Sequence, residues 1–325
     1  MRIRRSLESD GNLYPEAYNV LLSIPSQFCF HEEHGMRHPN SAYGTSLRLI
    51  AHQWVKLLDE LDCLRNEYFW ERKSDHIEIV VSEYAELLSR LNEHFDACFA
   101  ALRGLCPASM AAATTFDAQF LGNAKVPGWK LFRESLRPYR EDHIGHIVNT
   151  LKHKQGELCS IHFKSHTEFR PGYYLRDILP GGILGPSATI HSGGNTAFSF
   201  CRDMLIHLWW IFRIGGLLTN AIEAILEVQH KHRLVIKSQV PGDAKWEDVL
   251  LRCAGLSPEF FPDELLKPYP RVFVQPSPRA VVLEFPTSAR GIPLGDTATV
   301  STRLTVDGDH RSNKMPYMAQ WRDKN

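Results

Sequence analysis

Several signatures that would place this chain in a familiar class are missing from it. The seven cysteines are odd in number and scattered and include no Cys-x-x-Cys pair, which excludes a disulfide framework and a thiolate zinc site by pattern. The most apolar stretch, Met204 to Leu218, is interrupted by His207 and Arg213 and is too short to cross a bilayer. The basic N-terminus is followed by no apolar run, so it is not a signal peptide. We therefore expect a cytoplasmic protein with no membrane partner.

The formal charge is balanced, because the chain contains 37 Lys and Arg residues and 37 Asp and Glu residues. The molecule thus has no overall field that attracts nucleic acid, and an RNA partner would need a local basic patch. The sequence also has no Gly-x-Ser-x-Gly elbow, no P-loop, no kinase motifs and no EF-hand loop. Several large enzyme classes are excluded, and no cofactor is expected.

The periodicity of the apolar residues predicts a mainly α protein with added β structure, of the α+β class. Apolar spacings of three and four predict long helices over residues 47–68, 74–102, 140–155 and 195–229, with Asn195 or Thr196 as cap of the last. Residues 107–139 are expected to form a loop that carries a short helical piece. The expected core is a four-helix bundle.

Alternating residues predict strands at 159–163 and 173–175, and again at 271–275, 280–285 and 299–306, with a short helix at 246–253 before the last three. We expect an irregular N-terminal segment at residues 1–40. A helical bundle domain follows at residues 41–230, with a strand-containing insertion at residues 156–194. A C-terminal α/β extension at residues 231–325 packs on the bundle. Whether the inserted and C-terminal strands share one sheet is open.

The richest chemistry lies between Arg140 and His153. Read as a helix, this stretch puts Asp142, His146, Asn149 and His153 in one row, opposite an apolar face. Two imidazoles can act as general acid and base near neutral pH, and Arg140 at the start of the helix can hold a phosphate or an oxyanion. The same row is also what any solvated or interface-forming helix face displays.

Arg140 and His146 are separated by five residues, which resembles the Arg-x(4 to 6)-His motif of HEPN-type ribonucleases, with the polar Glu141 after the arginine. The resemblance covers residues 41–230 and is interrupted by the strand-containing insertion. It implies a four-helix bundle that forms a homodimer, with a composite site made by two motifs. It also implies metal-independent cleavage of RNA, of the toxic or phage-defence kind. Arg140 and His146 would be catalytic, with Asn149 and His153 in support.

Two alternatives remain open. The chain can be a non-enzymatic helical module that binds a protein or ligand. It can also be a hydrolase with a metal held by histidines, and His31, His34 and His38 are the candidates near the N-terminus. Their spacing is not that of a His-Glu-x-x-His helix, and a solvated loop is the better account of them. His153, His162, His166 and His191 are a second group that the fold would have to bring together.

Overall fold

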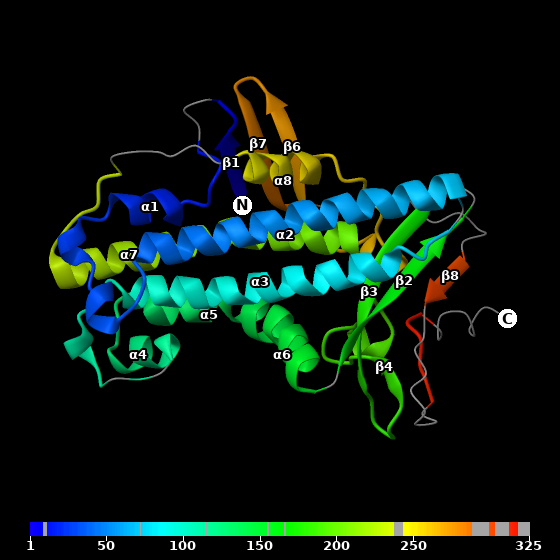
Figure 1. Ribbon diagram of the computed structural model, residues 1–325, viewed down its shortest axis with the longest axis horizontal. Coiled ribbons are helices and arrows are strands. Elements are labelled where there is room, and N and C mark those ends of the chain that lie inside the picture. The colour runs from blue at the N-terminus through cyan, green and yellow to red at the C-terminus, as the bar shows by residue number, and fades with distance from the viewer. Residues whose placement is uncertain are drawn as a thin grey trace.

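The computed structural model describes residues 1–8, 12–71, 73–112, 114, 116–154, 156–165, 167–236, 243–287, 299–302 and 312–317. The α+β class is confirmed, since long helices along one axis are joined to two sheets (Figure 1). The helices are α1 (Ala17–Ser23), α2 (Pro39–Asn66), α3 (Ile77–Arg103), α4 (Asp117–Asn123), α5 (Trp129–Tyr139), α6 (Gly145–His153), α7 (Phe200–His230) and α8 (Ala244–Ala254). Two π-helical turns, η3 (Glu67–Glu71) and η5 (Arg140–Ile144), follow α2 and α5.

The strands are β1 (Arg2–Ser6), β2 (Glu157–Lys164), β3 (Phe169–Ile178), β4 (Leu184–Pro186), β5 (Phe198–Ser199), β6 (Tyr269–Pro276), β7 (Arg279–Thr287) and β8 (Thr299–Thr302). Short 3-10 turns occur at Ser26–Phe28, His31–His34, Ala108–Met110, Ser192–Gly194 and Pro262–Glu264. Of the predicted strand at 299–306, residues 303–306 lie outside the described residues.

The helical core forms because the apolar residues of each long helix recur on one side. In α2, Leu47, Ile50, Trp54, Leu57 and Leu61 recur at spacings of three and four, and all are fully buried. Burial of each such side chain contributes about 2 kcal/mol. In α7 the apolar residues surround much of the helix, which therefore lies inside the molecule.

The helical layer differs from the expected one in two elements. Where a loop with a short helical piece was predicted at residues 107–139, the chain forms α4 and the 11-residue helix α5, which packs along α7. The third predicted helix is shorter than expected and is divided into the π-turn η5 and α6, which points away from the long axis (Figure 1). The four-helix bundle core stays a prediction.

The strands divide into two antiparallel sheets. β4, β3, β2 and β8 form one sheet in this order, and β5 adds to β3. The predicted insertion thus shares its sheet with β8 from the C-terminal region. β6 and β7 form a second sheet with β1, so the expectation of an irregular segment at residues 1–40 was wrong, because β1 and α1 are regular.

The start of the last long helix was also predicted too early. Phe198 and Ser199 first form β5 against Gly172 and Tyr173, and α7 begins at Phe200 with Ser199 at its N-cap. Among the residues that the structure describes, none of the helices combines the length and apolarity that crossing a lipid bilayer requires.

Candidate functional site

The π-turn η5 decides how the predicted site is arranged. The N–H of Gly145 donates to the carbonyl oxygen of Arg140, five residues earlier, so the turn contains one residue more than an α-helical turn. The extra residue rotates the side chains before Gly145 relative to those after it. The single row expected from Asp142 to His153 is therefore interrupted, and Arg140, His143 and His146 have different surroundings.

Arg140 is held against α3. The centre of its guanidinium lies 4.8 Å from the ring centroid of Phe99 and 5.9 Å from that of Phe95. Its Nε is buried and has no hydrogen-bond partner among the described residues. The stacking on aromatic rings orients the cation. Burial raises the pKa of the Asp96 carboxyl in α3, and the charge of Arg140 opposes this shift.

His146 lies on α6 and is half-buried. Burial lowers the pKa of His146, as does the charge of Lys154, while Asp177 opposes them. Its buried Nε2 has no hydrogen-bond partner among the described residues. The ring is thus a neutral imidazole that can accept a proton near pH 7.

Asn149 and His153 are exposed on the same helix, one turn and two turns after His146. Within the described part of a single chain, no recorded contact joins Arg140, His146, Asn149 and His153 to one another. The helix α6 presents these residues, but their convergence on one ligand stays a prediction.

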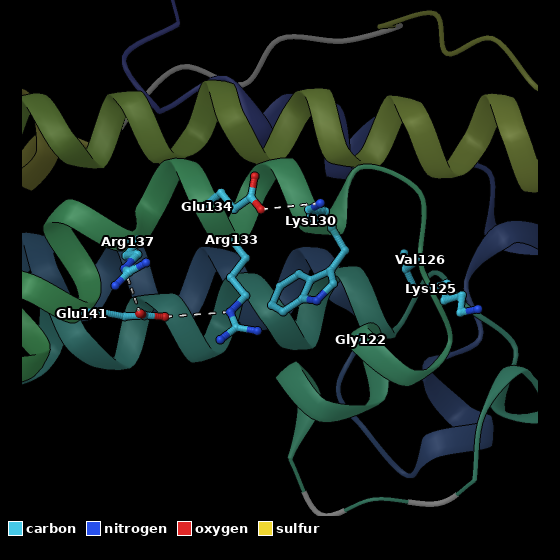
Figure 2. Close-up of a pocket in the computed structure, with 9 residues that line it drawn as sticks. Gly122, Lys125, Val126, Lys130, Arg133, Glu134, Arg137 and Glu141 are labelled. Carbon is cyan, nitrogen blue, oxygen red and sulfur yellow. Dashed lines mark ion pairs between the residues drawn. The ribbon is translucent and has the colours of Figure 1, made fainter.

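A cleft of about 580 Å³ lies beside this motif, between α4 and α5 (Figure 2). Its lining contains four cationic side chains, those of Lys125, Lys130, Arg133 and Arg137, and the carboxylate of Glu134, which lies 3.9 Å from Lys130. Glu141, the residue after Arg140, closes one end and lies 3.7 Å from Arg137 and 3.9 Å from Arg133. The cleft thus carries four cationic and two anionic side chains, and Trp129 of its lining is buried.

Two of the three N-terminal histidines, His34 and His38, have hydrogen-bond partners, whereas Nδ1 of His31 is buried without one among the described residues. His34 contacts the carbonyl oxygen of Cys106 through Nε2 at 2.8 Å and accepts from Arg103 through Nδ1. His38 accepts from the backbone N–H of Asn40 at the start of α2. Among the described residues, the groups of potential metal ligands that lie close together do not include His31, His34 or His38.

The second histidine group does not converge either. His191 accepts from the backbone N–H of Leu175 through Nε2, His162 is buried in β2, and His153 is exposed on α6. His166 lies outside the described residues.

A buried polar centre surrounds Asp203 in α7. Oδ2 of Asp203 accepts hydrogen bonds from the hydroxyl of Tyr84 in α3 at 2.7 Å and from that of Tyr173 in β3 at 2.5 Å. Nε2 of His207, one turn later in α7, lies 3.2 Å from the same oxygen. Nε2 of His143 in η5 lies 3.6 Å from Oδ1. Groups from three helical elements and a strand thus meet at one carboxylate.

The electrostatics keep this carboxylate ionised. Burial alone raises the pKa of Asp203, but the neighbouring His207 and His143 lower it well below its ordinary value. Burial raises the pKa of Tyr84 and Tyr173 well above 10, so both phenols stay protonated and donate. The centre is therefore a buried anion with two phenol donors and two imidazoles.

Sequence reasoning missed this centre because its members lie far apart in the chain. The one local signal was the pair Asp203 and His207, four residues apart within a long apolar stretch. Polar residues at that spacing share a helix face, and inside a buried helix they must find partners. His143 had no such signal, since only the π-turn directs it inward.

The chain has no match among protein-family models, curated proteins or solved structures.

Proposed function

We propose that this protein binds and cleaves RNA without a metal ion, as HEPN-type ribonucleases do, through Arg140 and His146. The observation that carries the proposal is the cleft lined by Lys125, Lys130, Arg133 and Arg137 together with Glu134 and Glu141, the last of which follows Arg140 in the chain. In this proposal the four cations of the cleft hold the phosphate backbone.

The chemistry follows from the residue types. His146, neutral at pH 7, removes the proton of a ribose 2′-hydroxyl, and the oxygen attacks the adjacent phosphorus. Arg140 stabilises the charge that develops on the phosphoryl oxygens. The 5′-oxygen leaves with a proton supplied by an acid, for which Asn149 and His153 provide the nearby hydrogen-bonding and imidazole groups. The products are a 2′,3′-cyclic phosphate and a 5′-hydroxyl end.

Because Arg140 and His146 face different surroundings within one chain, the proposal requires a second copy. In a homodimer across α6, the Arg140 of each copy would lie beside the His146 of the other, on a bundle of HEPN type. Light scattering after size-exclusion chromatography tests the requirement for a homodimer. We expect a dimer, and a monomer at the concentration of the assay would contradict the proposal.

The decisive experiment is cleavage of a single-stranded RNA in the presence of EDTA. We expect His146→Ala to lower the rate by about 10²-fold or more, the usual contribution of a general base. A matched RNA with one 2′-deoxy position should be uncut at that position, since it lacks the nucleophile. The control is His52→Ala, which removes an exposed histidine on α2. Equal rates for the two variants would remove the proposal.

A further inference from the structure

The centre around Asp203 contains more ligand atoms than the proposed ribonuclease needs. Nε2 of His143, Nε2 of His207 and a carboxylate oxygen of Asp203 all lie within 4.8 Å of one another. Asp203 and His207 are buried, with 3% and 0% of their side chains exposed, whereas the His143 side chain is 22% exposed. The cluster thus has an inner part and one ligand near the surface.

Two imidazole nitrogens of this centre lack a hydrogen bond within the described part of the chain. The Nε2 atoms of His143 and His207 are buried, and neither has a partner with hydrogen-bond geometry among the described residues. Oδ2 of Asp203 already accepts from two phenols. The two imidazole nitrogens therefore face one carboxylate only as ion pairs, at 3.2 Å for His207 and 3.6 Å for His143, and neither contact meets hydrogen-bond geometry. A cation between them would satisfy all three groups.

The surrounding residues also match a metal site. Histidine ligands in proteins use one ring nitrogen for the metal and hold the other by a hydrogen bond, and ligating carboxylates are themselves hydrogen-bonded. Here the hydroxyl of Tyr139 lies 2.9 Å from Nδ1 of His207, which leaves Nε2 for the metal. Tyr84 and Tyr173 orient Asp203 in the same manner.

We propose that His143, Asp203 and His207 bind one divalent transition-metal ion, such as Zn²⁺. Two imidazoles and a carboxylate suit zinc, iron and manganese, and three protein ligands leave a further position open. The ion enters past His143, the most exposed ligand. It joins η5 to α7 and so fixes the π-turn that carries Arg140. The proposal is independent of RNA cleavage, which requires no metal.

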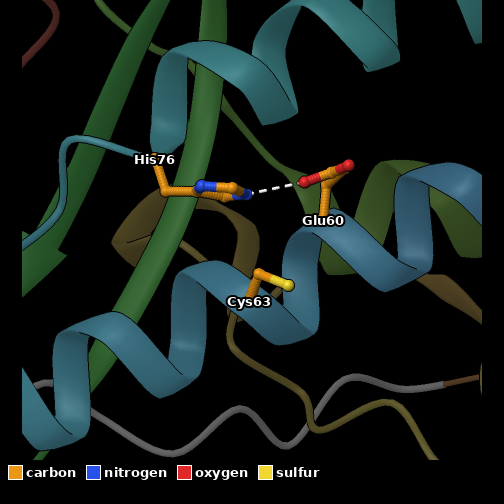
Figure 3. Close-up of side chains that lie close together, drawn as sticks. All are labelled: Glu60, Cys63 and His76. Carbon is orange, nitrogen blue, oxygen red and sulfur yellow. Dashed lines mark hydrogen bonds and ion pairs between the residues drawn. The ribbon is translucent and has the colours of Figure 1, made fainter.

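The chain contains one rival site among the described residues. Glu60 and Cys63 of α2 and His76 at the start of α3 also bring three ligand atoms together (Figure 3). They lie near the surface, and Nε2 of His76 already contacts Oε2 of Glu60 at 2.7 Å. Because this pair is satisfied without an ion, we favour the Asp203 centre. The thiol of Cys63 makes the two sites distinguishable.

The test is titration of the chelator-treated full chain with Zn²⁺ and Co²⁺. We expect one tightly bound equivalent in the unaltered protein, and at least 10²-fold weaker binding in His143→Ala. Tyr139→Phe, which keeps the ring and removes only the hydroxyl, should weaken binding about 10-fold. The Co²⁺ complex should have no thiolate charge-transfer band, since all proposed ligands are nitrogen or oxygen. Cys63→Ala should bind both ions as the unaltered protein does.

Zn²⁺ should also raise the melting temperature of the unaltered protein and of Cys63→Ala, but not that of His143→Ala. Circular dichroism shows whether each variant is folded, and Tyr139→Phe provides the comparison if His143→Ala is not. The proposal is overturned if the folded protein binds no stoichiometric ion. It is equally overturned if binding is lost in Cys63→Ala and kept in His143→Ala.

Discussion

At the scale of single residues, buried neutral histidines make stability depend on pH. His94 in α3 is 1% exposed, its Nδ1 contacts the hydroxyl of Ser46 at 2.8 Å, and burial lowers its pKa to about 4. An unfolded chain binds this proton with a pKa near 6.5, so acid favours unfolding. The stabilisation by a neutral His94 is complete above pH 6.5 and is lost as the pH falls toward 4.

We therefore predict that the free energy of unfolding decreases by about 2 kcal/mol per such histidine between pH 7 and pH 5. Urea unfolding at the two pH values measures it. In His94→Gln the difference in the free energy of unfolding between pH 7 and pH 5 should be smaller by about 2 kcal/mol. In His52→Gln, where the replaced side chain is exposed, the difference should stay the same. An unchanged pH dependence in His94→Gln would show that His94 already binds a proton in the folded state.

The sequence predicted which residues offer acid-base groups, but not the directions in which their side chains point. The stretch from Arg140 to His153 was correctly assigned to helical structure, because its apolar spacing is local information. The direction of His143 depends on one added residue in a turn, which periodicity does not reveal. The partnership of Asp203 with Tyr84 depends on contacts between residues 119 positions apart.

At the scale of elements, the π-turn requires glycine at position 145. A Cβ atom at Gly145 would overlap the carbonyl oxygen of Arg140, which accepts the hydrogen bond that defines the turn. We predict that Gly145→Ala opens η5 and lowers the free energy of unfolding by about 1–3 kcal/mol, the usual cost of overpacking. Because His143 would turn with it, Zn²⁺ binding should weaken as well.

The control for this change is Gly216→Ala in α7. A Cβ atom there meets only Oε2 of Glu16 at 3.9 Å, so alanine fits and should add up to about 1 kcal/mol through its helix propensity. Thermal unfolding compares the two variants. If Gly145→Ala were as stable as Gly216→Ala, the π-turn would be an incidental feature of the backbone.

Element boundaries followed from the sequence where apolar periodicity was strong, as for α3 and α8, whereas α2 begins at Pro39, eight residues before its predicted start. The length of α5 was underestimated because Gly128 and Pro138 suggest breaks, although Trp129, Phe132, Leu136 and Tyr139 mark a buried face. α5 ends at Tyr139, one residue after Pro138, and the chain continues into η5. Strand β1 could not be predicted, because its partner β7 lies near the other end of the chain.

At the scale of the whole molecule, β1 protects one edge of β7. β7 is paired with β6 on its other side, and Val281, Val282 and Leu283 are fully buried. We predict that a variant lacking residues 1–8 is less stable and aggregates, because the exposed edge of β7 is a template for pairing between molecules. Light scattering during heating measures the aggregation.

Two single substitutions distinguish the effect of losing the backbone pairing of β1 with β7 from the effect of losing a buried side chain of β1. Ile3→Ala removes a side chain that is 8% exposed and should cost about 2 kcal/mol or more, whereas the neighbouring Arg4→Ala should cost little. Both keep the backbone pairing, so neither should aggregate as the truncated protein does. Aggregation of Ile3→Ala alone would assign the effect to lost burial instead.

The sheet that receives β8 has a consequence for synthesis of the protein. Strand β2 pairs with β8, and Tyr317 stacks edge-on against Phe163 of β2, yet these partners leave the ribosome about 140 residues later. At usual elongation rates that interval is on the order of ten seconds. Throughout it the outer side of β2 is an unsatisfied backbone edge on a nascent chain. We therefore expect that a chaperone that shields this edge during synthesis raises the yield of folded protein.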